Sequence, residues 1–216
     1  MAEQNNLERK ETIIAHLESI LSNSDKSYDT DRIRSAMELA ISAHDGQFRK
    51  SGEEYVCHPL HVACILVEIG MDTDTVIAAL LHDVVEDAGV TLDEVEARFG
   101  KRVRELVAAE TEDKREERPA AETWRIRKEE SLALLAETDD IDVLMVWLGD
   151  KLANMRSIYR DWKIEGHAMW QRFNQKDVRE QAWYYGSIVK LTERLSDTSA
   201  WIEYKALAEI VFGKGE

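Results

Sequence analysis

The sequence predicts an all-α protein built as a single domain over residues 1–216. Apolar residues recur at helical spacing through most of the chain. Only two prolines and ten glycines interrupt it, which is few for an all-β protein with many turns. Apolar residues make up 44% of the composition, which is enough for a proper core. We therefore expect roughly eight to ten helices, each near the usual ~11–12 residues.

Start and stop signals place the helices of the first half of the chain. Pro59 stands at a first helical position, and Gly70 follows the end of the same helix. Gly89 ends the next helix, and Thr91 with Glu94 predicts a capping box at the start of another. The helices predicted in this half are 7–21, 31–44, 58–70, 72–87, 91–100 and 101–114.

The second half begins with a charged segment and ends in an aromatic one. Residues 112–122 are rich in charge and contain the second proline, so we expect a mobile, solvated loop that could also fold over a bound nucleotide. Aromatic residues at 168–187 fall at helical spacing, which favours a core over a base-stacking platform. The helices predicted in this half are 123–137, 140–162, 176–195 and 199–212.

The charge balance limits the partners that this protein can have. With 28 basic and 43 acidic residues the net charge is −15, which argues against a nucleic-acid polymer or an anionic membrane as partner. A small anionic ligand remains compatible if a basic cluster and a metal ion oppose the overall field. Two cysteines, with no secretory segment and no apolar run of 18 residues, predict a cytoplasmic protein without a disulfide framework.

Two histidines and two aspartates form a candidate metal site. His82 and Asp83 point ~100° apart on a helix, so they can share one ligand only if it lies over the edge between them. His58 opens a helix 24 residues earlier, which leaves room for one helix out and one back. Asp150 follows an apolar helical run, where a buried carboxylate needs a charged partner. This donor set suits manganese, iron or zinc better than calcium.

Each of these residues also has a purely structural explanation. A His–Asp dipeptide is commonly surface or core filler, and His58 is also explained as a helix-start residue. Asp150 could be an ion-pair partner of Arg156 or Lys151. The metal interpretation is favoured because several such residues fall at helix ends that can converge.

Two further acids and a basic loop are candidates for the chemistry around a metal. Glu86 and Asp87 each follow a candidate ligand by four residues, so they could orient or activate metal-bound water; the alternative is a solvated helix end. The basic loop, formed by Arg49, Lys50 and Ser51, offers phosphate-binding groups, although exposed basic loops are common. Asn154 could bind a ribose or base. Arg156 could contact a phosphate or form a structural ion pair.

Three segments together resemble one family. Residues 43–63, 78–100 and 147–158 look like the hydrolase domain of the RelA/SpoT family, within the HD phosphohydrolase superfamily. The resemblance covers about residues 30–160, and 161–216 resemble the family only as a helical C-terminal portion. The length without a synthetase domain is similar to that of the small alarmone hydrolases.

The resemblance implies an all-helical HD fold with one bound Mn²⁺ ion and a nucleotide substrate. The implied reaction is hydrolysis of the 3′-diphosphate of guanosine tetra- or pentaphosphate to GDP or GTP and pyrophosphate. By motif, the implied metal ligands are His58, His82, Asp83 and Asp150. The implied catalytic acids are Glu86 and Asp87, and the implied substrate contacts are Arg49, Lys50, Ser51 and Asn154.

The chain departs from the family pattern at a few positions. Trp147 replaces a lysine, Gly149 an alanine, Ala153 a histidine and Glu54 a proline. None of them is an implied ligand. The changes near Trp147 keep open a different nucleotide that bears a ribose phosphate. A non-catalytic nucleotide sensor is the other alternative, although a sensor needs neither a full ligand set nor an acid pair.

Overall fold

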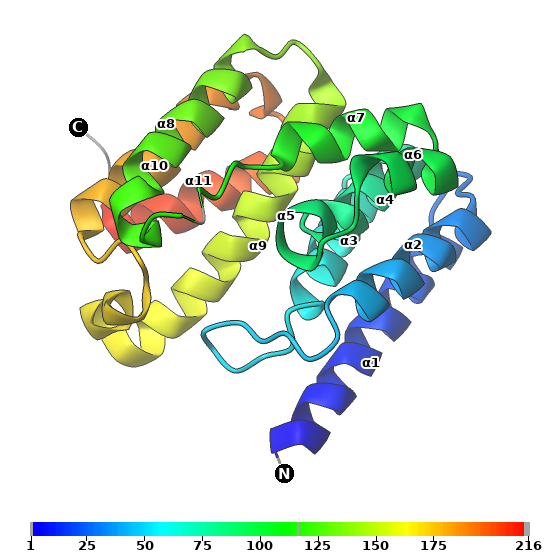
Figure 1. Ribbon diagram of the computed structural model, residues 1–216, viewed down its shortest axis with the longest axis horizontal. Helices are drawn as coiled ribbons and strands as arrows, with labels where there is room; N and C mark the ends of the chain where they lie inside the picture. Colours follow the sequence, from blue (N-terminus) through cyan, green and yellow to red (C-terminus); the bar gives the residue numbers. More distant parts are fainter. Residues whose placement is uncertain (1, 116, 214–216) are drawn as a thin grey trace. The chain divides into compact units, whose positions relative to one another are not determined.

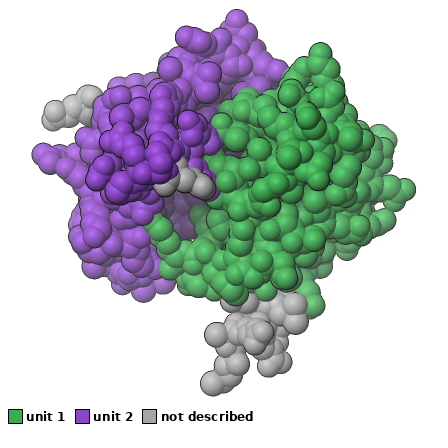
Figure 2. Space-filling view, in the orientation of Figure 1, with its two compact units in different colours: residues 1–111 green, residues 112–216 purple. Residues whose placement is uncertain are grey.

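The computed structural model describes the backbone of residues 2–115 and 117–213, and within these ranges the side chains from residue 9 onward. These residues form eleven α-helices and two short 3₁₀ segments, and they contain no strand beyond one isolated bridge between Phe48 and Glu54. The all-α expectation is confirmed. The chain divides into two compact units, Met1–Thr111 and Glu112–Glu216, coloured separately in Figure 2.

The first unit is organised around α3 and α4. Helix α4 contacts α2, α3 and α7, α1 packs on α3, and α6 packs on α7. Every residue of α4 from Thr75 to Leu81 is buried, as expected for a helix that is apolar on all sides. The helices of this unit are α1 (Ala2–Ser22), α2 (Thr30–Ala43), α3 (Cys57–Glu68), α4 (Thr73–Leu81), α5 (Val84–Ala88), α6 (Leu92–Phe99) and α7 (Lys101–Glu110), labelled in Figure 1.

Most of the residues expected to begin or end helices in the first unit do so. Thr91 and Glu94 form a complete capping box at the start of α6. Gly89 ends α5 with a φ of 71°, a left-handed conformation that glycine adopts without steric cost. Gly70 follows the end of α3. Pro59 is the third residue of α3 rather than the first, where its missing N–H is still harmless because the first turn has no acceptor for it.

The predicted helix over 72–87 is wrong in one respect, because it is two helices. Helix α4 ends at Leu81, α5 begins at Val84, and a turn at His82 and Asp83 separates them. The His82 ring explains the break: its Nδ1 lies 2.7 Å from the Ala79 carbonyl oxygen, which a continuous helix would pair with the Asp83 N–H. The bond from the Asp87 N–H to the Asp83 carbonyl, 2.8 Å, still keeps these two residues one turn apart.

In the second unit α11 packs on α9, and α10 packs on α8 and α11. Most aromatic residues of 168–187 belong to its core, as expected: Trp170 is 1% exposed and stacks on Phe212, with ring centroids 5.6 Å apart. Tyr184 and Tyr185 are buried as well. Phe173 and Trp183 are half-buried. The helical elements are α8 (Ala120–Glu137), α9 (Ile141–Glu165), η1 (Gly166–Arg172), α10 (Val178–Leu191), η2 (Glu193–Leu195) and α11 (Ser199–Phe212). None of the helices that the structure describes combines the length and apolar character needed to cross a bilayer.

The expectation of a solvated loop at 112–122 is wrong for Glu112. Its carboxylate accepts bonds from Arg127 Nη1 at 3.0 Å, Lys128 Nζ at 2.7 Å and Ser131 Oγ at 2.7 Å. Burial raises the pKa of Glu112, but the contacts with Lys128 and Ser131 lower it by more than burial raises it. The pKa therefore lies below its usual value. Helix α8 begins at Ala120, within the segment expected to be loop.

The substitution Glu112→Gln should therefore destabilise the protein, because it leaves the partly buried Lys128 and Arg127 without their counter-charge. We expect the free energy of unfolding to fall by about 3 kcal/mol, measured by urea unfolding at pH 7. Because the folded pKa of Glu112 is depressed, its contribution is present above the ordinary glutamate pKa of ~4.3 and is lost as the pH falls through the lowered value. Glu130→Gln breaks the more exposed pair with Arg115 and should change stability little; equal losses would contradict the role given to Glu112.

Candidate metal centre

His58 and His82 meet inside the first unit. His58 is the second residue of α3 and His82 follows the last residue of α4, so the packing of α3 on α4 brings the two rings together. Their centroids are 5.2 Å apart with the ring planes at 73°. They are 5% and 2% exposed. A ring nitrogen of each lies within 4.8 Å of the other.

The tautomer of His82 follows from its bond to the backbone. A carbonyl oxygen can only accept a hydrogen bond, so the His82 nitrogen 2.7 Å from the Ala79 oxygen, Nδ1, carries the proton. In the neutral ring the lone pair is then on Nε2, the atom that faces Asp83. Metal-binding histidines are commonly oriented in this way by a hydrogen bond from their other nitrogen.

Asp83 completes a group of three donors in this unit. Its Oδ2 lies 3.1 Å from His82 Nε2 and 3.8 Å from His58 Nε2. The lone pair of His82 Nε2 thus faces a carboxylate oxygen at 3.1 Å, and a metal ion held between the two atoms would remove their repulsion. Metal–ligand bonds of ~2.0–2.2 Å keep two ligands of one ion within about 4.4 Å, and both distances meet this limit. Two nitrogens and a carboxylate suit manganese, iron or zinc.

Tyr55 joins this group to the acids of α5, and the sequence reasoning missed it. Its Oη lies 2.9 Å from Asp83 Oδ2 and 2.9 Å from Asp87 Oδ2. Burial, and then the two carboxylates, raise the pKa of Tyr55 far above its usual value, so the phenol is a protonated donor at neutral pH. The shared hydroxyl also shows that Asp83 and Asp87 present their carboxylates to the same side, as the four-residue spacing predicted.

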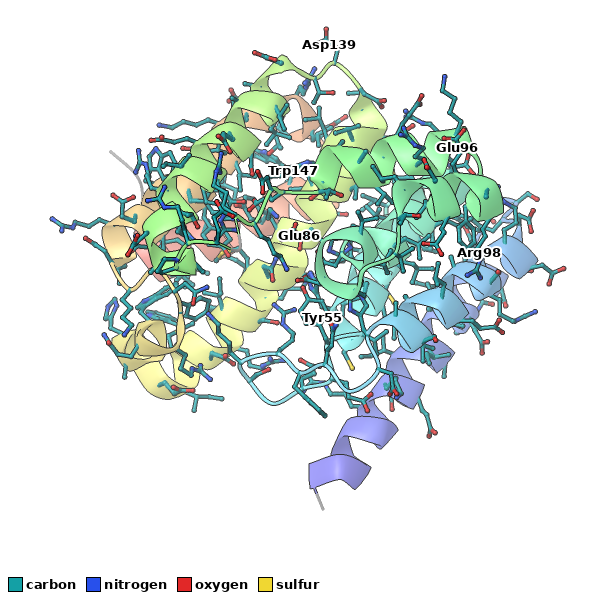
Figure 3. The ribbon with its side chains drawn as sticks, in the orientation of Figure 1. Tyr55, Glu86, Glu96, Arg98, Asp139 and Trp147 are labelled. Carbon is teal, nitrogen blue, oxygen red and sulfur yellow. The ribbon has the colours of Figure 1, made fainter. Side chains whose placement is uncertain are left out.

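The backbone of α5 is fixed from the same loop. Gln47 donates from Nε2 to the carbonyl oxygen of Asp87 at 2.9 Å, and its Oε1 lies 2.9 Å from His44 Nδ1. His44 is buried near the end of α2. It contacts Gln47, and Gln47 in turn is bonded to the backbone of α5. Glu86 is half-buried on α5, and Figure 3 labels it together with Tyr55 on the loop before α3.

The basic loop is a tight turn tied at its base. The Arg49 N–H donates to the Glu53 carbonyl and the Gly52 N–H donates to the Arg49 carbonyl, each at 2.8 Å. Gly52 has a φ of 84°, a conformation that favours glycine. Burial lowers the pKa of Lys50. Ser51, between Lys50 and Gly52, is exposed at the tip of this turn.

The remaining candidates lie in the second unit, on α9. Asp150 is 4% exposed and its carboxylate accepts from Lys151 Nζ and, at 2.7 Å, from Asn154 Nδ2. Arg156 makes a two-bond ion pair with Glu203, at 2.7 and 2.6 Å. This is the structural alternative for Arg156, and it favours an ion pair over a phosphate contact.

Trp147, which stands where the family has a lysine, also lies on α9. Its ring is 2% exposed and Lys151 Nζ lies 4.7 Å from the ring centroid.

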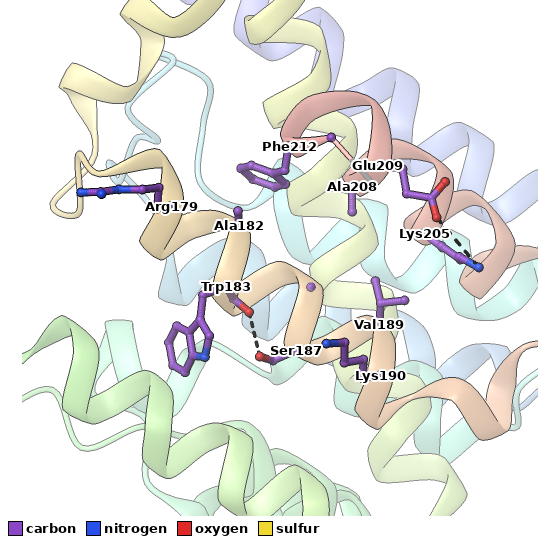
Figure 4. A pocket seen from close by; sticks show the side chains of 12 residues that line it. Arg179, Ala182, Trp183, Ser187, Val189, Lys190, Lys205, Ala208, Glu209 and Phe212 are labelled. Carbon is purple, nitrogen blue, oxygen red and sulfur yellow. Dashed lines mark hydrogen bonds and ion pairs between the residues drawn. The ribbon is translucent and has the colours of Figure 1, made fainter. Parts of the chain in front are cut away.

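The second unit has a groove of about 610 Å³ between α10 and α11. Figure 4 shows Trp183, Lys190 and Lys205 along it, and none of the candidate site residues lines it.

A family model described as HD domain matches residues 36–176, which are 141 of the 216 residues and span both units. The bifunctional (p)ppGpp synthase/hydrolase SpoT of Escherichia coli K12 is 42% identical over 134 residues. The guanosine-3′,5′-bis(diphosphate) 3′-pyrophosphohydrolase of Aquifex aeolicus is 40% identical over 129 residues. These matches cover 59% and 60% of this chain, and this chain spans less than a fifth (18%) of each relative.

Two solved structures are similar over more of the chain. The lmo0812 protein of Listeria monocytogenes is 31% identical, with a TM-score of 0.64, and the match covers 73% of this chain and 99% of that one. A metazoan ortholog of SpoT that hydrolyses ppGpp is 24% identical, with a TM-score of 0.68. That match covers 88% of this chain and all of the other, and it shows a shared fold.

Proposed function

This chain belongs to the HD domain family, and from that premise we propose that it hydrolyses the 3′-diphosphate of guanosine tetra- or pentaphosphate. The products are GDP or GTP and pyrophosphate. The observation that carries the proposal is the group of two buried histidines, His58 and His82, with Asp83, joined by one tyrosine hydroxyl to Asp87. The names of the relatives that are about 40% identical support the substrate.

We propose one Mn²⁺ ion as the cofactor, held by His58, His82, Asp83 and Asp150. The support for the first three is that the Asp83 Oδ2 lies 3.1 Å from His82 Nε2 and 3.8 Å from His58 Nε2. The support for Asp150 is its burial in α9 and the family match that runs through it. When bound, such an ion stabilises charge on the phosphoryl oxygens and makes a water more acidic.

The acids of α5 work on the attacking water in this proposal. Glu86 and Asp87 orient the water and take its proton as it adds to the phosphorus attached to O3′ of the ribose. The O3′–phosphorus bond breaks, and O3′ gains a proton as pyrophosphate leaves. Asp87 is suited to this role because both its main chain and its side chain are held, by Gln47 and by Tyr55.

The basic loop binds the diphosphate in this proposal. Arg49, Lys50 and Ser51 offer a guanidinium, an ammonium and a hydroxyl on one tight turn, which are the donors that phosphate oxygens prefer. Asn154, one turn after Asp150 on α9, contacts the nucleoside. Arg156 is left out of the binding site because Glu203 occupies its guanidinium.

The departure at Trp147 supports a second candidate, hydrolysis of another nucleotide with a ribose phosphate. A panel separates the two: the purified chain with Mn²⁺ is given guanosine tetraphosphate, GDP, and 3′-phosphorylated adenine and guanine nucleotides. We expect pyrophosphate from the tetraphosphate and no attack on GDP. Release of a monophosphate from a different nucleotide would favour the second candidate, and binding without turnover of any of them would favour a sensor.

Arg49→Ala should lower activity on the tetraphosphate by about tenfold or more, because a lost charged hydrogen bond costs ~1.5–3 kcal/mol. Steady-state kinetics of pyrophosphate release measures it. The matched control is Arg34→Ala, which removes an exposed arginine of α2 paired with Asp31 and should leave kcat/KM unchanged. An Arg49 variant with wild-type kcat/KM would remove the basic loop from the substrate site.

A further inference from the structure

One hydroxyl contacts two carboxylates at the candidate metal centre. The Tyr55 Oη lies at 2.9 Å from both Asp83 and Asp87, yet a phenol has a single proton. It can donate to only one of the two carboxylates at a time. Whatever engages Asp83 therefore changes how the hydroxyl is shared with Asp87.

The ring of Tyr55 has a fixed position. The His44 ring lies 4.8 Å from it, centroid to centroid, and the His58 ring meets it edge-on at 6.3 Å. The phenol thus packs on a candidate metal ligand on one side and on the residue that holds Gln47 on the other. A hydroxyl on such a fixed ring can direct a carboxylate.

Tyr55 also closes the base of the basic loop. Its N–H donates to the Gln47 carbonyl oxygen at 2.9 Å, so the loop that carries Arg49 begins and ends at residues bonded to Asp87. Gln47 contacts the main chain of Asp87, and Tyr55 contacts its side chain. Residues at both ends of the basic loop are thereby bonded to Asp87.

We propose that Tyr55 is a positioning residue that couples the metal ligand Asp83 to Asp87 through its shared hydroxyl. This inference rests on the proposed function. With a metal ion held by Asp83, the hydroxyl would donate to Asp87 and set the orientation in which that carboxylate meets the attacking water. Tyr55 acts through Asp87, and it does not contact the reacting phosphorus.

The substitution Tyr55→Phe keeps the ring and removes only the hydroxyl. We expect kcat to fall about 10- to 100-fold, as for the loss of one hydrogen bond to a charged group, with KM within about threefold of the wild-type value. Mn²⁺ content, measured by metal analysis, should remain one ion per chain. Tyr28→Phe, the same change outside the site in the same unit, should leave kcat unchanged. Loss of Mn²⁺ or an unchanged kcat in the Tyr55 variant would overturn the proposal.

A double-mutant cycle with Asp87→Ala tests the coupling itself. If Tyr55 acts through Asp87, adding Tyr55→Phe to Asp87→Ala should lower kcat less than about twofold further, whereas independent effects would multiply. The same cycle is run on the Mn²⁺ dissociation constant without substrate, where we expect the effect of Tyr55→Phe to differ by at least about threefold between the two backgrounds.

The two readouts separate failure of the inference from failure of the proposed function. Wild-type turnover with effects that multiply would overturn the role of Tyr55 and leave the function standing. No wild-type turnover with a coupled Mn²⁺ cycle would overturn the proposed substrate and leave the link between Asp83 and Asp87. A Mn²⁺ cycle without coupling would overturn the link.

Discussion

The double substitution Glu86→Gln with Asp87→Asn should lower turnover of guanosine tetraphosphate at least ~100-fold, the low end for a positioned acid–base group. Both changes keep side-chain size and hydrogen bonding but remove the base and two negative charges. We expect the Mn²⁺ content to stay near the wild-type value, because neither acid is a proposed ligand. Nucleotide binding should persist or tighten, since repulsion from the substrate phosphates is relieved. Single-turnover kinetics and equilibrium dialysis measure the two effects separately.

The control for this variant is Asp93→Asn with Glu96→Gln, two exposed acids of α6 in the same unit. It removes the same charge from the first unit and should leave turnover unchanged. Loss of the metal from the Glu86–Asp87 variant would make these acids part of the coordination shell. Full activity would make them an ordinary solvated helix end.

Asp150→Ala should remove most of the bound Mn²⁺ and with it the activity. The stability that metal binding adds to the folded state should be lost as well. The midpoint of thermal unfolding of the variant should therefore be the same in Mn²⁺ as in chelator. Metal analysis after dialysis and melting curves with and without Mn²⁺ measure this. In chelator, the variant should also be less stable than the wild type, because Lys151 and Asn154 lose their hydrogen-bond acceptor.

Asp161→Ala provides the comparison on the same helix. It removes a carboxylate of α9 that pairs with Arg172 at 3.0 Å, so it costs an ion pair without touching a proposed ligand. The Asp161 variant should keep both its metal and its Mn²⁺-dependent stabilisation. Stoichiometric metal in the Asp150 variant would remove Asp150 from the ligand set.

Local signals explain which parts of the fold were predicted from the sequence. The capping box of Thr91 and Glu94 involves residues three apart, and it formed as expected. The break between α4 and α5 was not predicted, because it depends on the His82 ring turning to the Ala79 carbonyl, a choice that hydrophobic periodicity does not report. Glu112 was misassigned for a related reason: its partners lie 15 to 19 residues away on α8.

The candidate site divides in the same way. His58, His82 and Asp83 were recognisable because several residues of metal-binding type fall at helix ends that can converge, and the packing of α3 on α4 brings them together. Tyr55 carried no such signal, since a neutral phenol in a loop is common. Its role depends on the fold, which places its hydroxyl between two carboxylates 28 and 32 residues further along the chain.

Hydrolysis of guanosine tetraphosphate in water labelled with ¹⁸O is the measurement that tests the account most directly. Water adds to the phosphorus attached to O3′ in this account, so mass spectrometry should find one labelled oxygen in the released pyrophosphate and none in the GDP. The reaction should depend on added Mn²⁺. Label in the nucleotide product, or release of a monophosphate in place of pyrophosphate, would contradict the proposed reaction.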